Sequence, residues 1–239
     1  MGRQTNIKII GTQGNIIYYK WKDVYSIRSK PAFVKQTKAT KASASVFGVA
    51  AGLGAALRKT FMPLLPDAKD RKMQLSFQTE LQYFLQQYRA GNIPAGAVTT
   101  ALHGFRFNEK AGSYGALQQL VSIKFILGNI AEAELKTLHF KQKLSAPKNT
   151  TTITLLVAAA SFNAMTGKIT DQHFLHQEIL YADETIDAKQ FTIPLQTAGN
   201  NCAIVAAALQ FNAIKNGIVE TEKKSRWLPA MVMGVWSVE

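Results

Sequence analysis

The sequence of 239 residues has a single cysteine, Cys202, and no long apolar run. One cysteine excludes a disulfide framework and any cysteine-rich zinc module. The longest unbroken apolar stretch, residues 46–57, is well short of the ~20 residues that a membrane span needs, so we expect no integral membrane protein. Residues 1–8 contain no apolar signal segment, which predicts synthesis in the cytoplasm, with release as part of a particle as an open alternative.

Acidic residues are scarce in the first third of the chain. Residues 1–72 carry 14 lysines and arginines against three aspartates, whereas residues 73–239 carry 14 against 12 acidic residues. The net charge of +13 is therefore concentrated at the N-terminal end. Such a basic segment is either a solvated surface or a face for an acidic partner, which means nucleic acid or a carboxylate-rich protein surface.

Catalytic signatures are also missing. The sequence has no Gly-x-Ser-x-Gly elbow, no Gly-Lys-Ser/Thr phosphate loop and no His-Glu-x-x-His motif. Cys202 opens an apolar strand, where a small buried residue is favoured over a nucleophile. We therefore predict that the protein is not an enzyme and holds no cofactor.

The best metal candidate is His173-x-x-His176, flanked by Asp171 and Glu178. Two histidines three residues apart share an ion on a helix or a turn, but on a strand they point to opposite faces. A surface histidine pair is the favoured interpretation, and we predict no metal site. An acidic loop of Asp183, Glu184 and Asp187 could bind a cation weakly. A solvated loop, or a docking point for the basic arm of a neighbouring copy, is the favoured interpretation.

The N-terminal pattern predicts a β-hairpin over residues 9–28. Strand-forming residues fill positions 16–21 and 24–27 on either side of a polar turn at Lys22-Asp23. Because an isolated hairpin is marginal in water, it must pack on its own body or on another subunit. Its apolar edge is suited to strand addition between chains.

The next segment predicts a basic arm followed by two helices. Pro31 favours extended backbone, and Lys35, Lys38 and Lys41 recur every three residues. We expect a helix capped near residue 40 or 43 that continues through residue 61, and a second, amphipathic helix over residues 67–90. Gly48-x-x-x-Gly52 would let another backbone approach the first helix closely.

From about residue 98 the pattern changes to a period of two. Strands are expected over residues 102–108, 121–127, 138–144, 151–163, 174–181, 190–195, 202–213 and 228–238. We predict an α+β fold, with a hairpin, arm and two helices followed by an antiparallel β-sandwich that is Ig-like or jelly-roll-like. The expected division is a region of residues 1–95 and a sandwich domain of residues 96–239.

Residues 9–65 also carry a family likeness. The motifs are Gly14-Asn15, Tyr19-Lys20-Trp21-Lys22, Ile27-Arg28-Ser29-x-Pro31, Val34-Lys35-Gln36-Thr37, Phe47-Gly48, Leu57-Arg58 and Phe61. This stretch resembles a family of uncharacterised Bacteroidota proteins with a domain of unknown function. The resemblance implies a hairpin, an arm, a helical stretch and a β-rich second half. Related openings in phage-derived sequences point to a virion-like or tail-like particle.

These patterns predict a structural protein that assembles with itself into an oligomer, a filament or a particle. The expected assembly residues are Ile17, Tyr19, Trp21, Pro31, Phe33, Val34, Gly48 and Gly52. The main alternative is a nucleic-acid-binding protein, with phosphate contacts from Arg28, Lys30, Lys35, Lys38 and Lys41. A third alternative is a sandwich that binds a small ligand or carbohydrate through Trp227 or Trp236.

Overall fold

The chain divides into two compact units, Met1–Ser43 and Ala44–Glu239. The computed structural model describes residues 2–4, 8–33, 35–64, 70–94, 98–99, 102–112, 114–126, 130–135, 138–139, 145–181, 185–186, 189–194 and 201–237. The boundary between the two units, after Ser43, differs from the expected division between residues 95 and 96. The physical reason is that the two predicted helices pack on the large sheet of the second unit, through the core given below.

The first unit is a small antiparallel sheet. Its strands are β1 (Gly2–Arg3), β2 (Gly11–Gln13), β3 (Ile16–Trp21) and β4 (Val24–Ser29), in the order β1-β4-β3-β2. The predicted hairpin is β3–β4, in which Trp21 pairs with Val24 across the turn at Lys22-Asp23. Two short strands extend it on either side.

Two long helices follow. Helix α1 (Lys38–Thr60) begins earlier than expected, because Oγ1 of Thr37 accepts a hydrogen bond from the backbone N–H of Thr40 at 3.1 Å. Lys38 and Lys41 therefore lie in the first turn of a helix and not on the extended arm. A short 3₁₀ turn, η1 (Met62–Leu64), precedes α2 (Arg71–Arg89).

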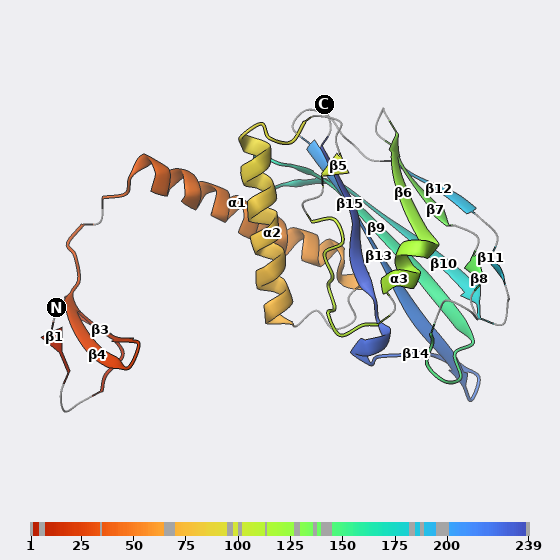
Figure 1. Ribbon diagram of the computed structural model, residues 1–239, viewed down its shortest axis with the longest axis horizontal. Coiled ribbons are helices and arrows are strands. Elements are labelled where there is room, and N and C mark those ends of the chain that lie inside the picture. The colour runs from red at the N-terminus through yellow and green to blue at the C-terminus, as the bar shows by residue number, and fades with distance from the viewer. Residues whose placement is uncertain are drawn as a thin grey trace. The chain divides into compact units, whose positions relative to one another are not determined.

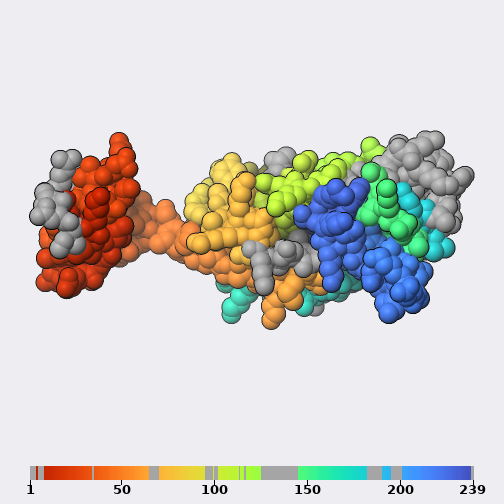
Figure 2. Space-filling model, turned by 90° about the horizontal axis from the view of Figure 1, so that it is seen from below, coloured from red at the N-terminus to blue at the C-terminus, as the bar shows by residue number. Residues whose placement is uncertain are grey.

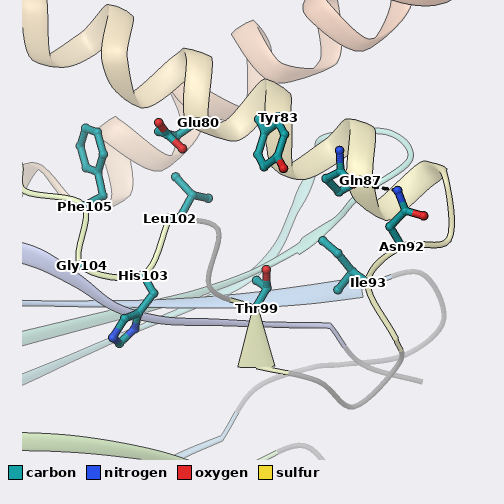
Figure 3. Close-up of a pocket in the computed structure, with 10 residues that line it drawn as sticks. All are labelled: Glu80, Tyr83, Gln87, Asn92, Ile93, Thr99, Leu102, His103, Gly104 and Phe105. Carbon is teal, nitrogen blue, oxygen red and sulfur yellow. Dashed lines mark hydrogen bonds between the residues drawn. The ribbon is translucent and has the colours of Figure 1, made fainter.

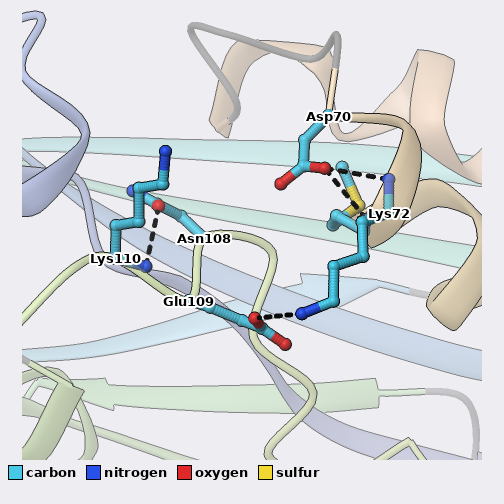
Figure 4. Close-up of polar contacts among 6 residues, drawn as sticks. Asp70, Lys72, Asn108, Glu109 and Lys110 are labelled. Atoms are coloured by element: carbon cyan, nitrogen blue, oxygen red, sulfur yellow. Dashed lines mark hydrogen bonds and ion pairs between the residues drawn. The ribbon is translucent and has the colours of Figure 1, made fainter.

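Helix α2 is capped by Asp70. Its carboxylate accepts hydrogen bonds from the backbone N–H groups of Lys72 at 2.9 Å and Met73 at 3.2 Å (Figure 4). The same first turn is tied to the following loop, since Nζ of Lys72 lies 3.2 Å from Oε2 of Glu109. Both side chains are exposed, so this ion pair adds little stability.

The second unit is built on a large antiparallel sheet. Its long strands are β9 (Thr152–Asn163), β10 (Ile169–Leu180), β13 (Asn201–Lys215) and β15 (Ala230–Ser237). Two short strands complete it, β5 (Val98–Thr99) and β14 (Ile218–Thr221). The order is β10-β9-β13-β15-β5, with β14 paired to β13 (Figure 1).

Smaller elements complete the described chain. These elements are α3 (Tyr114–Leu120), β6 (Val121–Ile126), β7 (Ile130–Leu135), β8 (Leu138–His139), β11 (Thr185–Ile186), β12 (Lys189–Pro194) and η2 (Ser225–Trp227). Three of the strands form a second antiparallel sheet of this unit, in the order β12-β7-β6.

Two hydrophobic clusters cover the two faces of the large sheet. On one face, Val157 and Val205 pack with Leu117 of α3, Val121 of β6 and Ile193 of β12. On the other face, strand residues pack against α1 and α2, among them Ala158, Phe162, Ile204, Leu53 and Phe84. The two sheets thus form an antiparallel sandwich, and the helices add a third layer. The predicted α+β class is confirmed.

One strand prediction is wrong, and a second is described only in part. Residues 102–108 form turns with one isolated bridge, between Arg106 and Met231, although they run beside β15 through three backbone hydrogen bonds of 2.8–2.9 Å. The expected strand over residues 138–144 is described only as β8, and its remaining residues lie outside the described part. The alanine-rich runs within residues 151–163 and 202–213 are strands, as predicted.

Candidate assembly interface

No apolar side chain is buried among the described residues of the N-terminal sheet. Among its described residues only Ser26 is buried, at 7% exposure. In the second unit, by contrast, Leu53 and Phe77 are completely buried. A sheet of this size needs a packed hydrophobic face for independent stability. The first unit therefore carries strand-forming apolar residues that its own described chain does not cover.

Apolar side chains lie on both faces of this sheet. Since side chains alternate along a strand, Ile17, Tyr19 and Trp21 share one face, with Val24 opposite Trp21. The other face carries Ile16, Tyr18, Tyr25 and Ile27. The structure thus brings together three of the predicted assembly residues in the N-terminal unit, which is red in Figure 2. Trp21 is 67% exposed.

Basic side chains lie over the aromatic rings of the same sheet. Nζ of Lys8 and of Lys20 lies 5.6 and 5.8 Å from the ring centre of Tyr25. The guanidinium of Arg28 lies 5.5 Å from the ring centre of Tyr19. These cation–π contacts place positive charge beside the exposed apolar side chains of both faces.

The described residues of the arm after β4 are exposed and lie outside any helix or strand. The N–H of Lys30 donates to the carbonyl of Asn15 at 2.6 Å, and the chain then leaves the sheet. Pro31 and Lys35 are exposed, and Phe33 is 80% exposed. The predicted assembly residue Val34 lies outside the described residues. The Phe33 side chain is therefore available for contact with another surface.

Gly48 and Gly52 lie on the exposed side of α1, in the second unit. A Cβ atom at either position would meet no heavy atom within 4 Å. At Gly54, on the opposite side, a Cβ would lie 3.4 Å from Cδ1 of Leu81 in α2. The Gly48-x-x-x-Gly52 spacing is therefore not used in the described packing of α1 on α2, and this side of the helix is open.

Helix α1 is also the one helix of the described residues whose length and composition would allow it to cross a membrane. One such helix is weak evidence, since core helices pass the same criterion. Leu53 and Leu57 of this helix are completely buried in the core against the large sheet. The expectation of no membrane span stays a prediction.

The histidine pair does not form a metal site in the described chain. Strand β10 places His173 and His176 on opposite faces, and the described residues contain no group of three potential metal ligands. Instead, Nε2 of His173 lies 3.0 Å from Oδ2 of Asp171. The acidic group at Asp183, Glu184 and Asp187 lies outside the described residues.

Cys202 is completely buried at the start of β13. Burial raises the pKa of its thiol to about 12, because the thiolate would lose its hydration. A thiol of this kind is not a nucleophile near neutral pH. Of the two tryptophans considered for ligand binding, Trp236 is buried, and Trp227 is half-buried and packs edge-to-face on Phe211 at 6.3 Å.

A groove of about 570 Å³ in the second unit lies between α2 on one side and Thr99 and residues 102–105 on the other (Figure 3). Glu80, Tyr83 and Gln87 reach into it from α2, and Gln87 accepts a hydrogen bond from Asn92 at 2.7 Å. His103 points away from the helix. The groove combines no nucleophile with a base, so its geometry does not indicate a reaction.

No protein family, curated protein or solved structure matches this chain. The resemblance of residues 9–65 to the uncharacterised Bacteroidota family therefore stays a prediction.

Proposed function

We propose that this chain is a non-enzymatic structural protein that assembles with copies of itself through its N-terminal unit. The observation that carries the proposal is the sheet β1–β4, in which none of the described apolar side chains is buried although such side chains lie on both faces. Each 100 Å² of apolar surface buried against a neighbour contributes about 2.5 kcal/mol. Contact with other copies would therefore supply the core that the unit lacks.

The likeness of residues 9–65 to the Bacteroidota family, and of such openings to phage-derived sequences, is part of this proposal. It suggests an oligomer, a filament or a particle formed in the cytoplasm. The exposed arm residues Pro31 and Phe33 and the open side of α1 at Gly48 and Gly52 supply further contact surfaces.

A matched pair of substitutions tests the proposal. Trp21 and Ile218 are both 67% exposed, but Trp21 lies on the N-terminal sheet and Ile218 on β14 of the second unit. We expect Trp21→Ser to shift the chain towards the monomer in sedimentation velocity, and Ile218→Ser to leave the assembly unchanged. Equal masses for both variants would contradict the proposal.

A second candidate function is nucleic-acid binding. The first unit carries nine lysines and arginines against one aspartate, and Arg28 lies over Tyr19. Lysines and arginines that neutralise phosphates release counterions, so about six such contacts give a slope near −5 for log affinity against log salt. The exposed Lys30, Lys35, Lys38 and Lys41 are the expected phosphate contacts together with Arg28.

Salt separates the two functions. Assembly through apolar burial is only weakly affected between 50 and 200 mM salt, whereas phosphate binding at that slope loses roughly a thousandfold in affinity. We expect the mass of the purified chain, free of nucleic acid, to be unchanged over this range. An assembly that forms only when nucleic acid is added, and that 200 mM salt dissociates, would favour the second function.

A further inference from the structure

The strand β10 is a long, open sheet edge. In the part of the chain that the structure describes, its twelve residues pair with β9 alone. The opposite edge of this sheet is covered, because residues 104–107 run beside β15 and bond to it. An edge of this length presents a row of backbone donors and acceptors to any extended chain.

The pairing shows which backbone groups face outward. The N–H of Tyr181 donates to the carbonyl of Thr151 on the β9 side, at 2.9 Å. Along a strand the backbone N–H and C=O groups of successive residues point to opposite neighbours. Those of His176, and of every second residue on either side of it, therefore point away from β9. The edge therefore offers its backbone groups at Phe174, His176, Glu178 and Leu180.

Side chains at these positions suit an apolar and basic occupant. Phe174 is 52% exposed, and Leu180 is exposed as well. Residues 169–188 contain five aspartates and glutamates and no lysine or arginine, and Glu178 is the exposed carboxylate of β10. This is an acidic stretch in a chain whose net charge is +13.

The arm of residues 30–37 has the complementary properties. Its described residues, 30–33 and 35–37, lie outside any helix or strand and have no strand pairing, and they include Lys30, Lys35 and the exposed Phe33. No acidic residue occurs between Asp23 and Asp67. Pro31 lacks an N–H group, but a proline is tolerated at the start of an edge strand.

We infer that the arm of one copy adds as a strand to the β10 edge of a second copy. The inference rests on the proposed self-assembly and names its contact. The arm is favoured over a second β10 edge, because pairing two such edges would bring carboxylates together. The arm and the β10 edge are different surfaces of the same chain, so each copy can bind one neighbour through its arm and another through its β10 edge. Repetition of the contact closes a ring or extends a filament.

Cross-linking between two differently tagged copies tests the contact. One copy carries Gln36→Cys on the arm and the other His176→Cys on β10, both exposed positions. The native Cys202 is buried and does not react at neutral pH. With a short bismaleimide we expect at least tenfold more mixed dimer than with Gln36→Cys and Val219→Cys, the matched control on exposed β14.

A backbone substitution gives an independent test. His176→Pro removes an outward N–H without removing a bond to β9, whereas His176→Ala keeps that N–H. We expect His176→Pro to raise the concentration at half-assembly by about tenfold, the effect of one lost hydrogen bond, with a melting temperature close to that of His176→Ala.

The outcomes separate the two levels of the account. If the unsubstituted chain is a monomer, the proposed function itself fails. If it assembles but the Gln36→Cys and His176→Cys pair gives no more mixed dimer than the control, the inferred contact is wrong while self-assembly stands. Cross-links that form only within single chains of a doubly substituted variant also overturn the contact between copies.

Discussion

Gly167, in the turn between β9 and β10, lies directly against Val49 of α1. A Cβ atom at Gly167 would lie 2.9 Å from Cγ1 of Val49 and 3.0 Å from its carbonyl oxygen. The backbone of Gly167 also has a positive φ of 71°. This close approach is one reason why residues 44–60 of α1 belong to the same compact unit as the large sheet.

Gly167→Ala should therefore be costly. The new methyl group meets backbone as well as a side chain, and an L residue is strained at this φ, so we expect a loss of about 2–4 kcal/mol in the free energy of unfolding. Gly217→Ala is the matched control, because Gly217 has φ of 78° but no heavy atom within 4 Å of the added Cβ. Urea unfolding measures both, and equal losses would show that the contact with Val49 is unimportant.

The two sides of α1 should respond differently to a large residue. Gly52→Leu adds a side chain where nothing lies within 4 Å and removes a glycine from a helix, so the isolated fold should be unchanged or slightly more stable. Gly54→Leu drives a side chain towards Leu81 and should cost about 1–3 kcal/mol.

The same pair reports on assembly. If the open side of α1 contacts another copy, Gly52→Leu should weaken assembly in light scattering while its circular dichroism and melting temperature stay native. Native assembly of Gly52→Leu would show that this side of the helix faces solvent in the oligomer.

Cys202 should make stability fall at alkaline pH. Its pKa is raised by burial from 9.0 to about 12 in the folded chain, so the folded state holds the proton that the unfolded state loses. The contribution of the Cys202 thiol to the free energy of unfolding is complete below pH 9 and is lost as the pH rises towards 12. We expect the unsubstituted chain to lose about 1 kcal/mol more than Cys202→Ala between pH 8 and pH 10. Identical pH profiles in urea unfolding would contradict this.

Replacing Phe33 of the arm should weaken assembly without destabilising the fold. Phe33→Ala removes an exposed ring, so the melting temperature should not change, but the concentration at half-assembly should rise at least tenfold if the ring is buried between copies. Ile214→Ala, at an exposed apolar position of β13, is the control. Equal assembly of both variants at moderate salt would argue against apolar docking of the arm.

Much of the secondary structure is predictable from local patterns. The hairpin β3–β4 follows from strand-forming residues around Lys22-Asp23, and α2 follows from the stripe through Phe77, Leu81 and Phe84. The start of α1 at Lys38 was misplaced because the capping Thr37 precedes residues that also fit an extended arm.

The division into units was not predictable in this way. It depends on Leu53 and Leu57 packing against the small side chains of Ala158 and Ala206, a contact over more than a hundred residues of sequence. Helix α3 was missed because its seven residues are too few for a clear helical period. The open edge at β10 was missed for a related reason, since strand order is a property of the whole sheet and alternation in one strand does not reveal its neighbours.

The mass of the full chain compared with that of residues 44–239 tests self-assembly most directly. The shorter chain retains the compact second unit, so circular dichroism should show it folded and β-rich. By light scattering at equal concentrations, we predict an oligomer for residues 1–239 and a monomer for residues 44–239. A full chain that is monomeric, or a shortened chain that assembles equally well, would contradict the account.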